Sequence, residues 1–368
     1  MLEKGKISAV QMSFLLYAIV IGTVIISVPA TIGKHAKNDL WLSPIWASLF
    51  GMIAVGVSIG LHRMFPRLTL IQSLSRIFGR IPGKLLGLAY LVFYLILNGH
   101  GIRLYADFIV GTALPSTPIL VLMATMIFVA SVAVYGGIEG IGRSSQVIVP
   151  LYVLTFLIIV LLLLPDAKPN RLFPMLENGI VPSLKGAVTP QGWFAETLLL
   201  SFILPCLSDS KKAMKWGLAA VLAVMTTLVL ANLIILLLYG NNVSRYVYPL
   251  LSATRYISYA EFFENVEAAL VAIWVLGNFI KFSIIQYAVV LGTAQWLELA
   301  DYRPLVWPIG FVMLLIGFWS LPNQMVLTQY SSTVFPYYSL LFQTILPLFI
   351  LFVAFLRIRA SRGGPTSG

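Results

Sequence analysis

Two residues of opposite charge interrupt apolar stretches of this sequence and are its strongest candidates for chemistry. Lys281 lies in the middle of the stretch 266–296, and Glu196 lies within the stretch 186–207. An ionised side chain at the centre of a bilayer costs at least about 2.5–3.5 kcal/mol, so it should face the protein interior and have a partner. Two interpretations are open: an ion pair that fixes helix packing, or charges that line a ligand cavity or replace a coupling cation. We favour the second, because uncharged contacts would pack the helices at lower cost.

The protonation state of Glu196 depends on its distance from Lys281. Burial favours the neutral carboxyl group, whereas a nearby ammonium group favours the carboxylate. The stretches 186–207 and 266–296 need not touch at mid-depth, so we expect the two residues to lie apart. Glu196 would then be protonated near neutral pH and act as a proton-sensitive gate beside the ligand.

Further polar residues occur in the apolar stretch 85–113. Asn98 is central in this stretch, so we expect it to line the same cavity, while Arg103 and Asp107 lie closer to one end. Their spacing of four residues predicts a salt bridge on one helix face. We expect this pair to tune the mouth of the cavity rather than to bind the ligand.

A glycine near the centre of the stretch 7–33 predicts a break in the helix. Gly22 is followed at once by Thr23 and later by Pro29. Free backbone groups inside a membrane require a ligand, a cavity or protein groups to satisfy them, and free amides attract anions. We expect a ligand carboxylate at the amides of Gly22, Thr23 and Val24, and its ammonium at carbonyls of 199–202. The candidate ligand-binding residues are Gly22, Thr23, Val24, Ile25, Asn98, Glu196, Leu199, Ser201, Phe202, Gly277 and Lys281.

The sequence contains no familiar catalytic or metal-binding pattern. Its single cysteine, Cys206, excludes an intrachain disulfide and a cysteine-based metal site, and its three histidines are scattered. Phosphate-loop, zinc-protease and nucleophile-elbow motifs are absent. The glycine cluster at 136–142 follows an apolar helix rather than a strand, which predicts a tight turn rather than a nucleotide site. We therefore expect neither an enzyme nor a protein with a metal or other cofactor.

Membrane-spanning helices must position these residues. Of the 368 residues, 59% are apolar and 10% are charged, whereas a soluble domain carries about a quarter charged residues. A membrane-spanning helix needs roughly 20 apolar residues. Ten stretches qualify, at 7–33, 40–61, 85–113, 118–135, 144–165, 186–207, 214–240, 266–296, 304–321 and 334–356.

The net charge of +11 also fits a membrane protein. One side of the membrane holds both chain ends and the loops near 63–84 and 209–215, and it carries about twice as many Lys and Arg residues as the other side. This bias predicts that both termini are cytoplasmic. A cytoplasmic rim that faces lipid headgroups accounts for the charge, so we expect no nucleic acid partner.

Ten spans divide into two sets of five, and the second set must then be inverted relative to the first. We expect an all-α polytopic membrane protein with one transmembrane domain over 1–368. Its repeats would be 1–165 and 166–368, with an outer loop at 241–265 and a short cytoplasmic tail at 357–368. In such proteins discontinuous helices mark the binding site. The first and sixth spans, with Gly22 and with Pro190 and Pro205, are the expected broken helices.

Several motifs resemble known membrane proteins. The stretch from Gly22 to Pro29 is similar to the glycine-rich first helix of amino acid–polyamine–organocation permeases, although Val24 stands where those permeases have a second glycine. The runs 114–118 (LPSTP), 136–143 (GGIEGIGR) and 278–283 (NFIKFS), together with Trp274 and Glu196, more specifically resemble the B subunits of endospore nutrient germinant receptors. The resemblance covers nearly the whole chain.

This resemblance implies a LeuT-like five-plus-five fold in which helices 1 and 6 are broken and helices 3 and 8 pack around them. It implies an amino acid ligand at the centre, sensed in the inner membrane of a dormant spore. It also implies partner A and C subunits. Lys281 would occupy the place where sodium-coupled relatives bind a cation, so no cofactor is needed.

Two other functions stay open. The protein could be a working amino acid permease, with or without proton coupling, or a membrane scaffold that binds no ligand. A sensor and a permease share a pocket and differ in flux. The scaffold hypothesis predicts that Glu196 and Lys281 satisfy only each other and that no cavity lies beside them.

Overall fold

The computed structural model describes residues 2–255, 257 and 266–362, and helices make up nearly all of this part. A parallel bridge between Ile7 and Leu207 is the one isolated β pairing among the described residues. The predicted outer loop 241–265 and tail 357–368 are covered in part, because residues 256, 258–265 and 363–368 lie outside the described residues.

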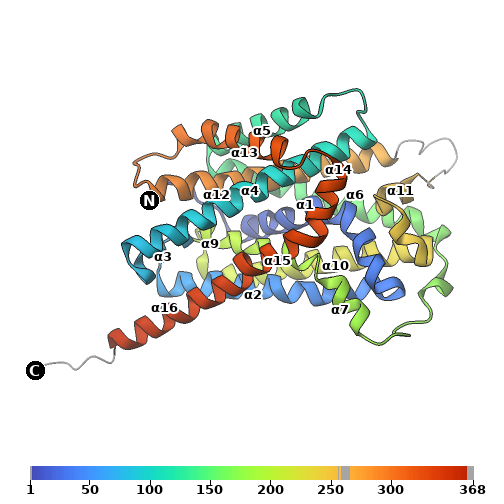
Figure 1. The fold of residues 1–368 in the computed structure, drawn as a ribbon, viewed down its shortest axis with the longest axis horizontal. Coiled ribbons are helices and arrows are strands. Elements are labelled where there is room, and N and C mark those ends of the chain that lie inside the picture. Colours follow the sequence, from blue (N-terminus) through green and yellow to red (C-terminus); the bar gives the residue numbers. More distant parts are fainter. Residues whose placement is uncertain (1, 256, 258–265, 363–368) are drawn as a thin grey trace, which may run out of the picture.

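Long apolar helices run along the longest axis of the molecule (Figure 1). Nine helical stretches of the described residues are long and apolar enough to cross a membrane, which confirms the predicted all-α membrane class. The long helices are α1 (Ala9–Ala36), α2 (Ser43–Met64), α4 (Arg80–Thr112), α5 (Ile119–Gly136), α6 (Ile138–Leu163), α10 (Ala213–Tyr239), α12 (Val266–Trp296) and α13 (Val306–Ser320). The shorter α3 (Leu70–Phe78) and α11 (Pro249–Thr254) lie between them.

The last span is built from pieces. It begins with α14 (Gln324–Gln329), continues through α15 (Phe335–Leu340), and ends with α16 (Leu346–Arg362). Two π-helical turns, Tyr330–Val334 and Leu341–Ile345, join these pieces. Such turns inside α-helices are frequent at functional sites.

The predicted sixth span, 186–207, is also divided into short pieces. After α7 (Val181–Ala187), it consists of α8 (Gln191–Ala195), a 3-10 turn (Glu196–Leu199), α9 (Leu200–Ile203) and a second 3-10 turn (Leu204–Cys206). None of these pieces could cross a bilayer alone, which is why this span is missing from the nine. All of residues 190–207 are nevertheless buried.

The first span differs from the prediction, because α1 is one continuous helix through Gly22 and Pro29. Ser8 and Gln11 begin it with a reciprocal capping box. Around Gly22 the side chains of Val20, Ile21 and Val24 are at most 1% exposed. Val24 in place of a second glycine favours the regular helix, because this β-branched side chain packs in the core. The expected break in helix 1 is therefore wrong.

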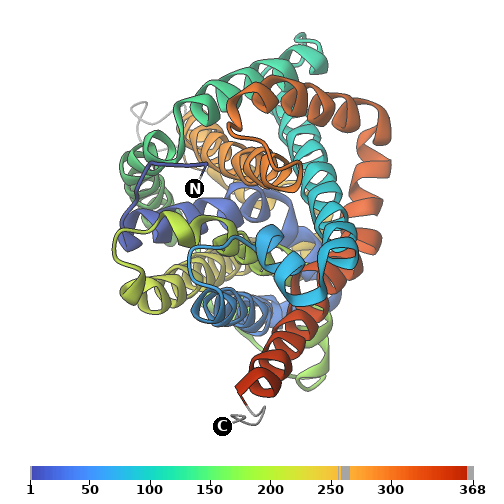
Figure 2. The same ribbon diagram turned by 90° about the vertical axis from the view of Figure 1, so that its left-hand side faces the viewer.

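The bundle has two ends, which side-chain contacts define. The terminal end holds the beginning of the described chain at residue 2 and the end of α16 (Figures 1 and 2). There Tyr302 donates to Glu3 at 3.0 Å, and Trp296 donates to the carbonyl of Lys84 at 2.8 Å. At the opposite end, called the loop end, Trp46 donates to Ser183 at 3.2 Å. The first described residues and the end of α16, where Arg357 donates to the Arg76 carbonyl, therefore group with the loop near 63–84 as predicted, although which end is cytoplasmic stays a prediction.

A strap of residues 2–8 closes the terminal end. Ile7 donates its amide to the Cys206 carbonyl at 3.0 Å and accepts the Ser208 amide at 2.9 Å, which fixes the strap to the end of the interrupted sixth span. The Glu3 carboxylate accepts hydrogen bonds from the amide of Gly5 and from the hydroxyl groups of Tyr287 and Tyr302. Burial raises the pKa of the Tyr302 hydroxyl, so Tyr302 remains a hydrogen-bond donor to Glu3 at neutral pH.

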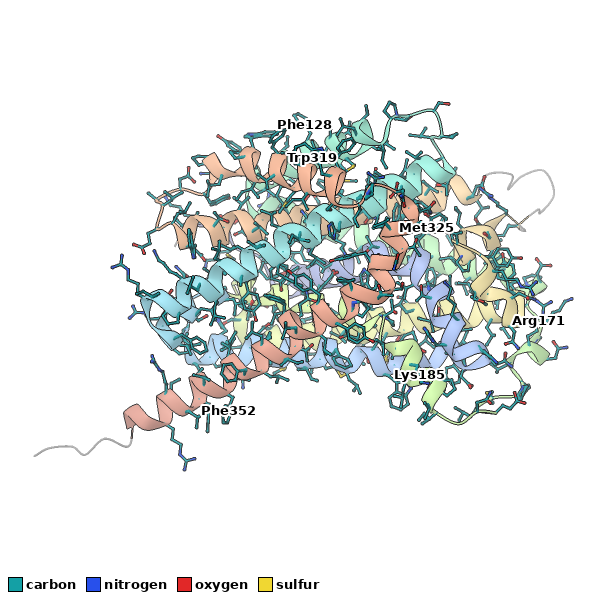
Figure 3. The ribbon with its side chains drawn as sticks, viewed as in Figure 1. Phe128, Arg171, Lys185, Trp319, Met325 and Phe352 are labelled. Atoms are coloured by element: carbon teal, nitrogen blue, oxygen red, sulfur yellow. The ribbon has the colours of Figure 1, made fainter. Side chains whose placement is uncertain are left out.

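The flanks of the bundle are apolar. Phe128, Trp319 and Phe352 are 58%, 71% and 59% exposed and point away from the core (Figure 3). Arg171 lies at the loop end in the same view. A soluble protein rarely exposes aromatic side chains of this size on several helices, whereas a lipid bilayer accommodates them. The distribution fits an integral membrane protein with α1 near the middle of the bundle, packed against α6, α10 and α12 (Figure 2).

Candidate ligand site inside the bundle

Four side chains from three parts of the chain meet in the core. The Lys281 ammonium on α12 lies 2.8 Å from the Glu196 carboxylate and donates a second hydrogen bond to the Thr23 hydroxyl at 2.8 Å. The Trp193 indole donates to the same hydroxyl oxygen at 2.8 Å. Thr23 on α1 therefore joins the interrupted sixth span to α12.

The contact between Lys281 and Glu196 corrects the expectation that they lie apart. Their side chains are only 3% and 1% exposed. The expectation treated residues 186–207 as a regular helix, but the 3-10 turn at Glu196–Leu199 sets the direction of this carboxylate. Two buried charges at this distance stabilise each other as ions. The premise of the gate, a Glu196 without a cationic partner, therefore does not hold in this structure.

The surroundings of Gly22 also differ from the prediction. Its carbonyl accepts the Asn278 side-chain amide at 2.7 Å, and a Cβ at Gly22 would lie 3.1 Å from Cδ of Lys281. Gly22 thus allows α12 to approach α1 closely. Because α1 is continuous, the amides of Gly22, Thr23 and Val24 belong to helical hydrogen bonds. The expected carboxylate site required free amides, which this continuous helix does not provide.

The remaining candidates lie elsewhere in the core. Asn98 donates to the Phe282 carbonyl at 3.3 Å and so ties α4 to α12. A Cβ at Gly277 would meet the Tyr152 ring on α6 at 3.4 Å. Val24, Ile25, Leu199, Ser201 and Phe202 are all buried, and none of them lines the cavity beside Lys281. Within the predicted set, only Thr23, Glu196 and Lys281 line that cavity.

The second predicted ion pair is present. Arg103 lies 3.1 Å from Asp107 on α4, and its guanidinium also donates to the Pro322 carbonyl at 3.2 Å. The pair therefore links α4 to the turn before α14. Neither residue lines the cavities described next.

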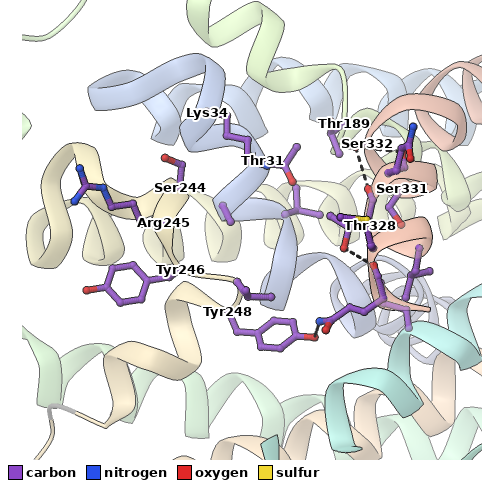
Figure 4. Close-up of a pocket in the computed structure, with 18 of the residues that line it drawn as sticks. Thr31, Lys34, Thr189, Ser244, Arg245, Tyr246, Tyr248, Thr328, Ser331 and Ser332 are labelled. Atoms are coloured by element: carbon purple, nitrogen blue, oxygen red, sulfur yellow. Dashed lines mark hydrogen bonds between the residues drawn. The ribbon is translucent and has the colours of Figure 1, made fainter. Parts of the chain in front are cut away.

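A large cavity of about 620 Å³ opens at the loop end, and Figure 4 shows polar side chains around it. Thr31 and Lys34 come from α1, Tyr248 precedes α11, and Thr328 and Ser331 come from the last span. A deep cavity of about 40 Å³ lies next to it. Both cavities share the lining residues Leu104, Trp193, Leu327 and Ser331, so the two cavities adjoin.

The deep cavity ends at the buried charges. Thr23, Glu196 and Lys281 form its polar floor, and Leu97, Leu104 and Phe335 contribute apolar walls. His100 and Tyr330 also line it, with their rings 4.6 Å apart. The loop-end cavity thus adjoins a smaller cavity lined by an ion pair in the core, an arrangement suited to the charged groups of a polar ligand.

Sequence reasoning missed the contribution of the last span. Tyr330, Ser331 and Phe335 line the deep cavity from a π turn and its flank. Tyr330 and Ser331 lie before the predicted span 334–356, and nothing in the sequence signals their role, because the π turn depends on backbone geometry. Trp193 was also missed, although its place three residues before Glu196 in an interrupted span is a signal that could have identified it.

The family model and the related sequence described here both point to spore germination proteins. A model of the family described as spore germination protein matches residues 6–325. Spore germination protein KB of Bacillus subtilis (strain 168) is 25% identical over 366 residues, which cover 96% of this chain and 95% of that protein.

Two solved structures resemble this one. MhsT in complex with L-phenylalanine has a TM-score of 0.68 at 12% identity and covers 96% of this chain and 99% of its own. Mhp1, a nucleobase-cation-symport-1 family transporter in a closed conformation with bromovinylhydantoin bound, has a TM-score of 0.66 at 14% identity, over 92% of this chain and 75% of its own. At identities this low the comparison shows the fold alone. The TM-scores confirm the predicted LeuT-like fold. The division into repeats at 165 and 166 stays a prediction.

Proposed function

The chain belongs to the spore germination protein family, and from this premise we propose that it is the amino-acid-binding subunit of a spore nutrient germinant receptor. A small amino acid enters through the loop-end cavity, binds in the core and changes the contacts that the protein makes with partner subunits. The observation that carries the proposal is that an open cavity adjoins a second cavity lined by the buried residues Thr23, Glu196 and Lys281.

An amino acid suits this cavity for two reasons. The loop-end cavity, of about 620 Å³, has room for an amino acid, and the adjoining deep cavity, of about 40 Å³, presents Thr23, Glu196 and Lys281 to the charged groups of the ligand. MhsT, which shares the fold, is in complex with L-phenylalanine. Thr23, Glu196 and Lys281 contact the ligand, whereas Gly22, Asn98 and Gly277 set the helix packing around it.

The proposed location is the inner membrane of the spore, with the terminal end in the cytoplasm and with A and C subunits as partners. The excess of Lys and Arg at that end supports the orientation. A test replaces Leu2 by Cys in a Cys206→Ala background and uses a maleimide that does not cross membranes. Labelling in inside-out vesicles but not in right-side-out vesicles is expected, and the reverse pattern would contradict the orientation.

Lys281 acts as a fixed internal cation in this proposal. Its ammonium links α12 to Thr23 on α1 and to Glu196, so it supplies a positive charge where a coupling ion would otherwise be needed. Amino acid binding should therefore have the same affinity in sodium chloride and in choline chloride at equal ionic strength. A strong requirement for sodium would contradict this role.

An amino acid permease is the second candidate, because Mhp1, which shares the fold, is a transporter. The scaffold hypothesis is less well supported, because Lys281 contacts Thr23 as well as Glu196 and a cavity lies beside them. The deciding experiment uses purified protein in liposomes with each of the twenty amino acids as radiolabelled probe. Saturable binding without accumulation supports the sensor, accumulation supports the permease, and no binding of any amino acid contradicts both.

A further inference from the structure

The floor of the deep cavity is electrically neutral but dipolar. It contributes one carboxylate, from Glu196, and one ammonium, from Lys281, on separate elements of the chain. His100, which also lines this cavity, has its Nε2 atom 2.7 Å from the Ser320 hydroxyl. The two charges are 2.8 Å apart and nearly inaccessible to solvent, so each depends on the other for neutralisation.

This charge pattern discriminates between classes of ligand. A ligand with only a cationic group would pair with Glu196 and leave Lys281 buried without a counter-charge. A ligand with only an anionic group would pair with Lys281 and leave Glu196 buried without a counter-charge. A zwitterion supplies both charges, so it can replace the internal ion pair by two new ones without leaving a buried charge unpaired.

The polar neighbours of the two charges determine which end of a zwitterion binds to which charge. Thr23 lies beside the Lys281 ammonium and can donate its hydroxyl hydrogen while its oxygen accepts from Trp193. A carboxylate therefore meets two donors on the Lys281 side and an ammonium meets an acceptor on the Glu196 side. The rest of the ligand extends past Leu104 and Leu327, the apolar residues shared with the loop-end cavity.

We propose that this protein recognises zwitterionic ligands by ion-pair exchange, in which the ligand carboxylate binds Lys281 and Thr23 and the ligand ammonium binds Glu196. The inference rests on the proposed function and specifies how its site selects a ligand. It replaces the expected backbone site on α1, whose amides lie within a continuous helix.

The test compares matched ligands on the full chain in lipid nanodiscs. L-alanine is compared with L-alaninamide, which is only cationic, and with propionate, which is only anionic. Each of the remaining amino acids is compared in the same way with its amide and its deaminated acid. We expect the amino acid to bind at least tenfold more tightly than either analogue. Equal affinity for an amide or a deaminated acid would overturn the inference.

Variants test whether Glu196 and Lys281 recognise the charged groups of the ligand. The double variant Glu196→Gln/Lys281→Met removes both charges together and should lose the tenfold preference, whereas the control Arg103→Gln/Asp107→Asn removes an ion pair that lines neither cavity and should keep it. The exchange variant Glu196→Lys/Lys281→Glu, which restores both charges, should regain the preference. If the double variant does not fold, the exchange variant decides: a folded protein that binds amino acid and amide equally well overturns the inference.

The outcomes separate this inference from the proposed function. If no amino acid binds the wild-type protein, the proposed function fails and the inference fails with it. If amino acids bind and the uncharged double variant keeps the preference for zwitterions, the proposed function stands and ion-pair exchange alone is wrong.

Discussion

Lys281 and Glu196 each provide the other with its counter-charge in the core of the bundle. Lys281 also donates to Thr23, so one ammonium group contacts two other parts of the chain. Removing one partner of a buried ion pair is far more destabilising than removing both, because it leaves a buried charge uncompensated. The stability of the fold and the chemistry of the site therefore depend on the same residues.

This dependence predicts a specific pattern of stability. Glu196→Gln should lower the free energy of unfolding by about 3–5 kcal/mol, because Lys281 loses its carboxylate. Adding Lys281→Met should recover most of that loss. Denaturation of the purified variants in detergent micelles measures both values. Equal stability of the single and double variants would contradict the claim that Glu196→Gln leaves an uncompensated charge on Lys281.

The identity of these two residues was predictable from sequence, but their contact was not. A Lys and a Glu in apolar stretches must face the interior because lipid excludes them. Whether they meet depends on the rotation of residues 196–199, which a 3-10 turn sets. Trp193 could have been suspected from its place three residues before Glu196, but its hydrogen bond to Thr23 appears only in three dimensions.

At the scale of elements, the approach of α12 to α1 places the ammonium group. Gly22 permits this approach, since a Cβ there would lie 3.1 Å from Cδ and 3.3 Å from Cβ of Lys281. Asn278 holds the same contact by donating to the Gly22 carbonyl. The glycine that the sequence suggested as a point of unwinding is a point of close packing instead.

Gly22→Ala tests this packing role. The added methyl group should improve helix propensity by up to about 1 kcal/mol, but it must displace Lys281 by a few tenths of an ångström. We expect amino acid affinity to fall severalfold with the fold retained. Gly56→Ala in α2 is the matched control, because a Cβ at Gly56 meets nothing within 4 Å. Titration of both variants with radiolabelled amino acid gives the comparison, and equal affinities would contradict the packing role.

The regular helices could be predicted from sequence, because long apolar stretches bounded by turn residues have few alternatives in a membrane. The turn at Gly137, which separates α5 from α6, is an example: its φ of +90° favours glycine. The pieces of the last span could not be predicted, because a π turn at Tyr330–Val334 leaves no simple pattern in the residues.

At the scale of the whole molecule, the cavity beside the core ion pair adjoins the loop-end cavity, while the strap of residues 2–8 packs across the terminal end. Glu3 holds the strap to Tyr287 and Tyr302, and Ile7 holds it to the sixth span. A sensor can keep this end closed throughout its cycle, whereas a permease must open it to release its substrate. The strap is therefore the place where the two candidate functions differ structurally.

The single cysteine of the chain reports on this closure. Cys206 is buried and lines a small cavity at the terminal end together with Glu3. Glu3→Gln weakens the hydrogen bonds that hold the strap, so we expect Cys206 to react with a small maleimide several times faster than in the wild type. Glu177→Gln at the loop end is the control. Unchanged reactivity of Cys206 in Glu3→Gln would show that Glu3 does not hold the strap closed.

The central claim is that an amino acid binds in the cavity beside Lys281, and protection of a cysteine at Ser331 tests it most directly. Ser331 lines both cavities, so Ser331→Cys in a Cys206→Ala background places one thiol on the path of the ligand. The measurement is the rate at which a water-soluble thiol reagent modifies it with and without a saturating amino acid. The account predicts that the amino acid slows the modification at least tenfold. An amino acid that binds the protein saturably and leaves this rate unchanged would contradict it.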